Sequence, residues 1–143
     1  WFTAGTLVYP ITFMITDITN RIMGKDAAQR VVLLGFVIAF PFSVGASSLR
    51  VAVASSIAYL TSHMADVAIF DKMRAIRAWW VAPIVSSMSA SLLDSSLFVT
   101  IAFLGEPVPW VLWGIGDFAV KASMSLLALV PFRFLTRGVP VRA

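Results

Sequence analysis

Residues 78 to 103 read "AWWVAPIVSSMSASLLDSSLFVTIAF", and this stretch decides the fold class. It is apolar or weakly polar throughout, apart from one charged residue, Asp94. A helix needs about 20 such residues to cross the hydrocarbon core of a bilayer, because it rises about 1.5 Å per residue and the core is roughly 30 Å thick. We therefore predict a transmembrane helix over residues 79–104.

The rest of the chain has the same character. Its 143 residues are 59% hydrophobic and only 13% charged, with a mean hydropathy of +0.91, which is well outside the range of soluble domains. Further spans are predicted at residues 4–23, 31–48, 50–70 and 110–135. They are predicted as helices because a bilayer offers the backbone no hydrogen-bond partners. The predicted fold is an all-α polytopic membrane protein, a single transmembrane domain over residues 1–143 with five transmembrane helices.

The charged residues between the spans predict how the chain is oriented. The connections after the first and third spans and the end of the chain are rich in Lys and Arg, whereas the other two connections hold only Arg50 and Glu106. By the positive-inside rule the basic ends are cytoplasmic, so Trp1 lies outside and the C-terminus inside. The basic residues are Arg21, Lys25 and Arg30, then Lys72, Arg74 and Arg77, and finally Arg133, Arg137 and Arg142.

Composition excludes several kinds of chemistry. The chain has no cysteine and one histidine, His63, so it offers no thiol nucleophile and no sulfur-ligated metal site, and the histidine cannot build a metal cluster unaided. The sequence pI of about 10.1 does not predict nucleic-acid binding, because the basic residues sit in short loops instead of gathering on a water-facing surface. No cofactor is expected, and any chemistry rests on carboxylates, lysine, hydroxyl groups and aromatic rings.

Four of the predicted spans each carry one aspartate, although a charged side chain near the centre of a membrane helix costs roughly 2.5 to 3.5 kcal/mol. Three of the four have a basic residue three or four positions away, on the same helix face. Asp94 has none, so we expect its partner on another helix or in a ligand. The predicted pairs are Asp17 with Arg21, Asp117 with Lys121, and His63 with Asp66. Such pairs can be purely structural.

Small hydroxylated side chains surround Asp94. At helical spacing Asp94 shares one helix face with three serines and a phenylalanine, namely Ser87, Ser91, Ser95 and Phe98. A face of this kind lets helices approach closely and hydrogen-bond across their interface. It equally suits the wall of a water-accessible groove, and both uses are compatible with the sequence.

Residues 114–121, "GIGDFAVK", match the Gly-x-Gly-Asp signature of intramembrane aspartyl proteases. Such an enzyme needs a second carboxylate that shares a proton with the first. The preceding span offers "LLD" at Asp94 instead of the Tyr-Asp pair of those proteases, their later Pro-Ala-Leu segment is absent, and Lys121 favours an ionised Asp117. A transporter accounts better for polar groups spread over several spans. A channel is less well supported, because nothing in the sequence resembles a repeated selectivity ring.

Four segments carry a resemblance that covers nearly the whole chain. They are "YPITFMITDITNRIMG" (9–24), "RVAVASSIAYLTSHMADVAIFDKMR" (50–74), "AWWVAPIVSSMSASLLDSSLFVTIAF" (78–103) and "GDFAVKASMSLLALVPF" (116–132). In these segments the chain resembles the queuosine precursor transporter family, the YhhQ type within the vitamin uptake transporter group. Members have six spans, so we expect a sixth helix before Trp1 in the complete protein. The connection at 43–49 is short for the family.

The resemblance implies a transporter, and not an enzyme, that imports 7-cyano- or 7-aminomethyl-7-deazaguanine across the bacterial inner membrane for tRNA queuosine modification. Asp94 or Asp17 is expected to accept the N–H donors of the guanine edge, and an aromatic lid (Phe13, Phe98 or Phe118) to stack on the base. The expected substrate-binding residues are Asp94, Asp17, Asp117, Lys121, Ser91, Asp66, Phe98 and Asn20.

Several alternatives stay open at this point. Carboxylates and His63 permit proton coupling, but the same residues suit a facilitator. A wider similarity to the substrate-binding subunits of energy-coupling-factor importers implies ATPase partner chains, since this chain has no Gly-rich phosphate loop of its own. Whether the protein forms a homodimer is equally open.

Overall fold

The computed structural model describes residues 4–76 and 78–139, except for the side chains of residues 4–7 and 10. These residues form five α-helices and no strand, which confirms the all-helical prediction. Helix α2 begins earlier than its predicted span, at Lys25 instead of 31. Trp1, Arg77 and Arg142, used above for orientation, lie outside the described residues. The helices are α1 (Ala4–Met23), α2 (Lys25–Ala46), α3 (Leu49–Met73), α4 (Val81–Phe103) and α5 (Trp110–Thr136).

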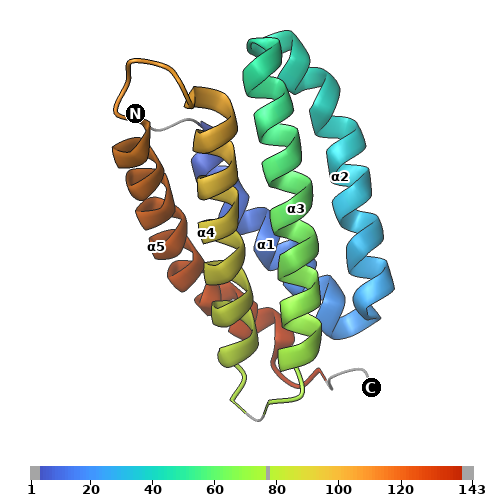
Figure 1. The fold of residues 1–143 in the computed structure, drawn as a ribbon. Coiled ribbons are helices and arrows are strands. Elements are labelled where there is room, and N and C mark those ends of the chain that lie inside the picture. Colours follow the sequence, from blue (N-terminus) through green and yellow to red (C-terminus); the bar gives the residue numbers. More distant parts are fainter. Residues whose placement is uncertain (1–3, 77, 140–143) are drawn as a thin grey trace.

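The helices run alternately up and down in one bundle (Figure 1). The α2–α3 turn and the α4–α5 connection lie at one end, called the upper end here, and the α1–α2 and α3–α4 connections lie at the lower end. Helix α1 packs against each of the other four helices. It therefore brings its side chains within reach of residues from every other helix.

Four of the described helices, α2 to α5, are long and apolar enough to cross a membrane. Helix α1 is the exception, and the buried residues of this central helix include Thr16, Asp17 and Asn20. Four such helices make the chain a multi-pass membrane protein, and the crossing of α1 stays a prediction. The polar character of α1 fits its place among the other helices, where its side chains meet protein groups.

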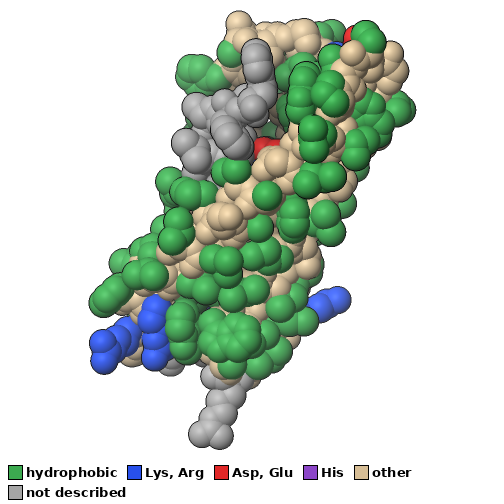
Figure 2. All heavy atoms as spheres, turned by 90° about the vertical axis from the view of Figure 1, so that its left-hand side faces the viewer, with side chains coloured by type: hydrophobic (Ala, Val, Ile, Leu, Met, Phe, Trp, Pro, Cys, Tyr) green, Lys and Arg blue, Asp and Glu red, His purple; other side chains and the backbone are tan. Residues whose placement is uncertain are grey.

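The outer surface is apolar. Large hydrophobic side chains of α2 and α5 are exposed, among them Leu34 (63%), Val37 (65%), Leu127 (65%) and Phe134 (72%). Figure 2 shows hydrophobic side chains over most of one face and Lys and Arg side chains near its lower end. A soluble monomer rarely exposes an apolar surface of this extent, whereas lipid chains solvate it well.

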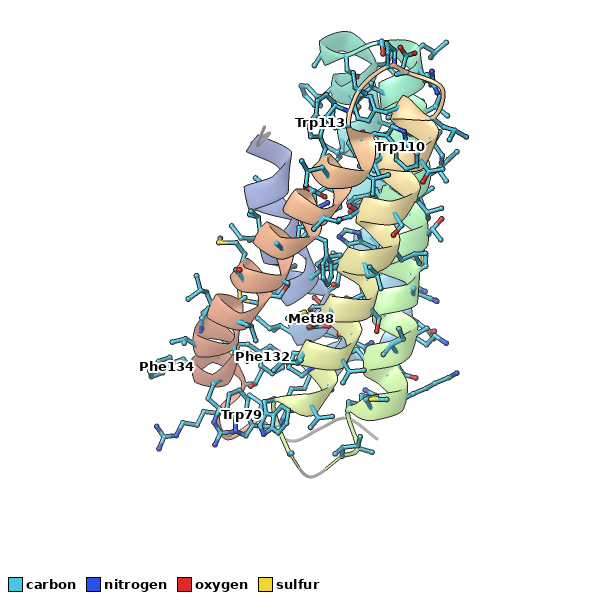
Figure 3. All side chains as sticks on the ribbon, turned by 60° about the vertical axis from the view of Figure 1, so that its left-hand side comes forward. Trp79, Met88, Trp110, Trp113, Phe132 and Phe134 are labelled. Atoms are coloured by element: carbon cyan, nitrogen blue, oxygen red, sulfur yellow. The ribbon has the colours of Figure 1, made fainter. Side chains whose placement is uncertain are left out.

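Aromatic residues mark both ends of the bundle (Figure 3). Trp110 and Trp113 lie at the upper end and Trp79 at the lower end, where the guanidinium of Arg133 sits 4.8 Å from the centre of its ring. Tryptophan favours the headgroup region of a bilayer, and a cation over its ring adds a favourable interaction. The two tryptophan levels are consistent with the two membrane interfaces.

Short connections hold the ends of the bundle together. Gly24 joins α1 to α2 with a φ of 93°, a conformation that side chains with a Cβ rarely adopt. At the upper end, Ser48 caps α3 by accepting a hydrogen bond from the backbone N–H of Val51. Arg50 pairs with Glu106 at 3.0 Å and donates to the carbonyls of Ile101 and Leu104 at 3.0 and 2.6 Å. The two charged residues of the upper connections thus tie α3 to the end of α4.

The two glycines of the "GIGD" stretch differ in their surroundings, and this difference gives a prediction. A Cβ added at Gly114 would lie 2.9 Å from Cγ2 of Val99 on α4, whereas one added at Gly116 would meet nothing within 4 Å. Overpacking a tight contact costs about 1 to 3 kcal/mol. We expect Gly114→Leu to lower the melting temperature of the purified protein in detergent and the matched variant Gly116→Leu to leave it near the wild-type value. Equal melting temperatures for the two variants would contradict this close α4–α5 contact.

Candidate functional site

A cavity of about 370 Å³ lies among the upper halves of all five helices. Its volume falls in the range of small-molecule sites, roughly 300 to 1,000 Å³. We call it the upper cavity. Its lining residues are Val8, Tyr9 and Thr12 of α1, Gly35, Phe36, Ala39, Phe40 and Ser43 of α2, Ser55, Ser56 and Tyr59 of α3, Asp94 and Phe98 of α4, and Asp117 and Lys121 of α5.

The charged groups of the upper cavity form an ion triad. The Nζ atom of Lys121 donates to Oδ2 of Asp94 at 2.6 Å and also pairs with Oδ2 of Asp117. Serine hydroxyls hold the two carboxylates in place: Ser62 donates to Asp94 at 3.2 Å and Ser95 to Asp117 at 2.8 Å. The side chains of Asp94 and Lys121 are 2% and 4% exposed, while that of Asp117 is 18% exposed.

The triad resolves two expectations from the sequence. Asp117 and Lys121 form an ion pair across one helical turn, as predicted. Asp94, which has no basic neighbour on its own helix, finds its partner on α5 in the same lysine. Two carboxylates with one ammonium leave one negative charge in excess. A ligand that offers N–H donors compensates such a charge, since hydrogen bonds to a charged group are about twice as strong as neutral ones.

Aromatic rings stack beside the triad. The imidazole of His63 lies between the rings of Tyr59 and Phe13, with centroid distances of 4.1 and 4.4 Å. Tyr9 meets His63 edge-on at 5.6 Å, and the Nζ atom of Lys121 lies 4.7 Å from the centre of the Tyr9 ring. Of these rings, Tyr9 and Tyr59 line the cavity, while His63 and Phe13 are buried behind them. The two tyrosines give the cavity an aromatic wall next to its charged floor, an arrangement that suits a planar ligand with a polar edge.

The three aromatic residues proposed as a lid occupy different places. Phe98 lines the upper cavity. Phe13 lies beneath the wall, fully packed against His63, and Phe118 is not among the lining residues. Of the three, only Phe98 is placed to touch a bound base.

Close approach of α2 and α3 sets the position of Tyr59. A Cβ added at Gly35 would lie 2.6 Å from the hydroxyl oxygen of Tyr59, so the glycine leaves the space that this ring occupies. The hydroxyl of Tyr59 in turn lies 3.4 Å from the carbonyl oxygen of Val32. The small residue on α2 thus helps to shape the cavity wall.

Asp17 and Asp66 form a second polar cluster, below the upper cavity, which we call the acid pair. Their carboxyl groups face each other within hydrogen-bonding reach, and both residues are at most 2% exposed. Ser86 donates to Asp17 at 3.4 Å and Thr16 to Asp66 at 3.2 Å. The pair draws on α1 and α3, and the serine that supports it comes from α4.

The acid pair corrects two predicted ion pairs. Asp17 does not pair with Arg21, and Asp66 does not pair with His63: among the described residues, the carboxyls contact each other and the hydroxyls, and His63 contacts Thr12 at 2.9 Å and the carbonyl of Tyr59 at 3.1 Å. Helical spacing places two residues on one face, but which rotamer each side chain adopts depends on its contacts with neighbouring helices. The partners of both aspartates lie across an interface.

The two other predicted site residues lie away from the upper cavity. Ser91 is fully buried, and its hydroxyl has no hydrogen-bond partner within the described part of the chain. Asn20 lies near the lower end, where its amide donates to the carbonyl of Val67 at 2.9 Å. Of the eight predicted site residues, Asp94, Phe98, Asp117 and Lys121 line one cavity.

Sequence reasoning missed several residues of the site. Tyr9, Thr12, Phe36 and Tyr59 all line the upper cavity, and none was proposed. A signal existed for two of them: Tyr59 lies four residues before His63, and Tyr9 lies eight residues before Asp17, so each shares a face with a polar residue already singled out. Phe36 lies in an otherwise apolar helix without any polar neighbour that marks its face.

Comparison with known proteins assigns the chain to a family. A family model described as "putative vitamin uptake transporter" matches residues 3–49 and 39–136. The chain belongs to this family. No solved structure matches the chain.

Three curated proteins are similar to the chain over most of its length. They are a "probable queuosine precursor transporter" of Haemophilus influenzae (32% identical, covering 90% of this chain and 66% of the relative), the "queuosine precursor transporter" of Escherichia coli (29%, 90% and 70%) and a "probable queuosine precursor transporter" of Bacillus subtilis (28%, 94% and 71%). The chain thus spans about two thirds of their length. These matches confirm the family resemblance found in the sequence.

The family match falls into two pieces that meet at residues 39–49. This region contains the upper end of α2 and its turn into α3, which consists of only Ser47 and Ser48. The sequence had indicated a short connection at the same place. Phe40 and Ser43, which line the upper cavity, lie in this region, whereas Asp94, Asp117 and Lys121 of the ion triad lie outside it.

Proposed function

We propose that this vitamin uptake transporter imports 7-deazaguanine precursors of queuosine, namely 7-cyano- or 7-aminomethyl-7-deazaguanine, across the bacterial inner membrane. The observation that carries the proposal is the ion triad of Asp94, Asp117 and Lys121 at the floor of a cavity with an aromatic wall. The names of three relatives supply the ligand class. The protein moves the precursor without changing it chemically.

The ligand fits the residues of the upper cavity. The guanine edge offers adjacent N–H donors, and the excess negative charge of the triad provides an acceptor for them. Hydrogen bonds to a charged group contribute about 1.5 to 3 kcal/mol each. Phe98 and Tyr59 offer rings on which the flat base can stack, a contact that adds about 1 to 3 kcal/mol in other base-binding sites.

The distribution of charge supports an orientation for import. Among the described residues, Arg50 is the one basic side chain at the upper end, while Lys25, Lys72 and Arg137 belong to the lower end. We propose that the lower end and the C-terminus face the cytoplasm. The upper cavity then faces outward, where it collects the precursor.

Release on the other side requires the lower half to open. There Phe70 of α3 and Phe132 of α5 are almost fully buried, meet edge-on at 6.2 Å and pack with Met73 and Trp79. In Figure 3, Phe132 points toward the neighbouring helices and Phe134 away from them. We propose that this aromatic cluster closes the cytoplasmic side while the upper cavity is open, as alternating access demands.

The test uses a bacterial strain that makes no queuosine precursors and lacks its own importer. With 7-cyano-7-deazaguanine supplied at a low concentration, we expect cells expressing this protein to contain queuosine in their tRNA and cells with an empty vector to contain none. Queuosine at equal levels in both strains, or its absence despite normal amounts of the protein in the membrane, would overturn the proposal.

A further inference from the structure

We propose that the acid pair of Asp17 and Asp66 is a proton-binding site and that the protein carries a proton inward together with its substrate. The inference rests on the proposed transport function and adds its energy source. Although the sequence suggested substrate-binding roles for both aspartates, neither lines the upper cavity, and we assign substrate contact to the residues that do line it. We assign one proton, shared between the two carboxyl groups, to the described conformation.

The geometry of the pair requires a proton. The carboxyl groups of Asp17 and Asp66 face each other within hydrogen-bonding reach, and both are buried. Two ionised carboxylates are acceptors only, so a bond between them needs one carboxyl to be protonated. Like charges in such contact cannot both ionise at ordinary cost. The Oδ1 atom of Asp66 is buried and receives no hydrogen bond from any donor among the described residues. A bound proton would satisfy this oxygen.

The charged groups around the pair do not neutralise it. On α1, Arg21 forms no ion pair with either carboxyl among the described residues. On α3, His63 bonds to Thr12 and to a backbone carbonyl. On α4 and α5, Asp94 and Lys121 are bound to each other, and Arg133 lies over the ring of Trp79. Helix α2 has no charged residue after Arg30. A proton is therefore the compensating charge that the site can take.

A water-sized space adjoins Asp17. A cavity of about 10 Å³ is lined by Asp17, Ser87 and Ser125 together with apolar side chains. Ser125 is 8% exposed, and its hydroxyl has no partner among the described residues. A buried hydroxyl without a partner next to a carboxyl indicates a missing polar ligand, and about one probe sphere of volume is what a single water needs. A water molecule in this space could pass a proton between Asp17 on α1 and Ser125 on α5.

Hydrogen bonds connect the acid pair to the substrate site. Thr12 lines the upper cavity, and Thr16, one helical turn below it, donates to Asp66. On α3, Ser62 donates to Asp94 of the ion triad and lies one turn above Asp66. Both sites therefore share α1 and α3. A change in the carboxyl pair that moves either helix also moves a wall of the upper cavity.

The proton step needs no other reactant. On the outer side an O–H bond of a hydronium ion breaks and its proton forms an O–H bond with one carboxyl oxygen. On the cytoplasmic side this bond breaks and a water molecule takes the proton, forming hydronium again. The driving force is the proton gradient: one pH unit corresponds to about 1.36 kcal/mol, so one proton per substrate supports about tenfold accumulation at zero membrane potential.

The experiment uses the purified protein in liposomes that contain no ATP and hold a trapped pH-sensitive dye, with the membrane potential clamped at zero. With the outside one pH unit more acidic, we expect labelled 7-cyano-7-deazaguanine to accumulate about tenfold and the interior to acidify as it enters. Asp66→Asn and Asp17→Asn are expected to keep substrate exchange without a gradient and to lose both accumulation and acidification. The control Asp26→Asn, the same change at an exposed position of α2, is expected to behave as wild type.

The outcomes separate the two proposals. Exchange without proton movement in the wild-type protein, or unchanged coupling in Asp66→Asn, would overturn the proton site and leave the transport function standing. Absence of any exchange by the wild-type protein would instead overturn the transport function. If the Asn variants do not fold, infrared spectroscopy of the wild-type protein decides: we expect the carbonyl band of a protonated carboxylic acid, shifted in heavy water, and its absence would overturn the proton site.

Discussion

Lys121→Met is expected to abolish precursor uptake and to destabilise the protein more than any other single change at the site. The ammonium of Lys121 compensates Asp94 and Asp117 together, and its removal leaves two carboxylates close to one another, of which Asp94 is almost fully buried. Removing one partner of a buried ion pair costs about 3 to 5 kcal/mol. The measurements are uptake into cells and the melting temperature of the purified protein.

Two further variants sharpen this prediction. Lys25→Met makes the same change at an exposed position at the start of α2, and it should leave both uptake and melting temperature near wild type. The double variant Lys121→Met with Asp94→Asn removes one of the uncompensated charges. It should regain part of the lost stability without regaining uptake. Wild-type uptake by Lys121→Met would contradict the role of the ion triad in transport.

Asp94→Asn has the second largest expected effect, and it falls on substrate affinity. The variant keeps the shape of the side chain and the pair of Lys121 with Asp117, but it removes the excess negative charge that we assign to the N–H donors of the guanine edge. The loss of one charge-assisted hydrogen bond, about 1.5 to 3 kcal/mol, corresponds to roughly a 10- to 150-fold higher KM for uptake. Uptake is measured at several precursor concentrations and normalised to the amount of protein in the membrane.

The distribution of the effect between KM and stability is informative. If Asp94 serves only to neutralise Lys121, Asp94→Asn lowers the melting temperature and leaves KM unchanged. If it also accepts hydrogen bonds from the base, KM rises even where the melting temperature is preserved. Asp26→Asn on the surface of α2 is the matched control for both quantities.

Hydropathy alone predicts the helices, because a bilayer segment must be apolar over its whole length and must satisfy its own backbone. Helical spacing is a second guide within one turn of a helix, because the four-residue spacing of Asp117 and Lys121 predicted their ion pair. Helical spacing does not predict which side chains meet between two helices. Arg21 and His63 stand at suitable spacing beside Asp17 and Asp66, but these two carboxyls meet each other across the α1–α3 interface.

The candidate site shows the same limit. Asp94 and Phe98 were proposed from polar or aromatic residues on one face of a span, and both line the upper cavity. Tyr9 was missed because its place beside Lys121 depends on how α1 packs against α5. Tyr59 lies one turn from His63 on the same helix, a spacing visible in the sequence, but its place in the cavity wall depends on the close approach of α2 at Gly35. Interhelical contacts decide which polar residues share a cavity, and hydropathy carries no information on them.

The most direct test of the central assignment is an experimental structure of the protein with 7-cyano-7-deazaguanine bound. We expect the base in the upper cavity, with its guanine edge within hydrogen-bonding distance of Asp94 or Asp117 and its ring against Phe98 or Tyr59. A precursor bound elsewhere in the protein, with the ion triad of Asp94, Asp117 and Lys121 intact and untouched, would contradict the account.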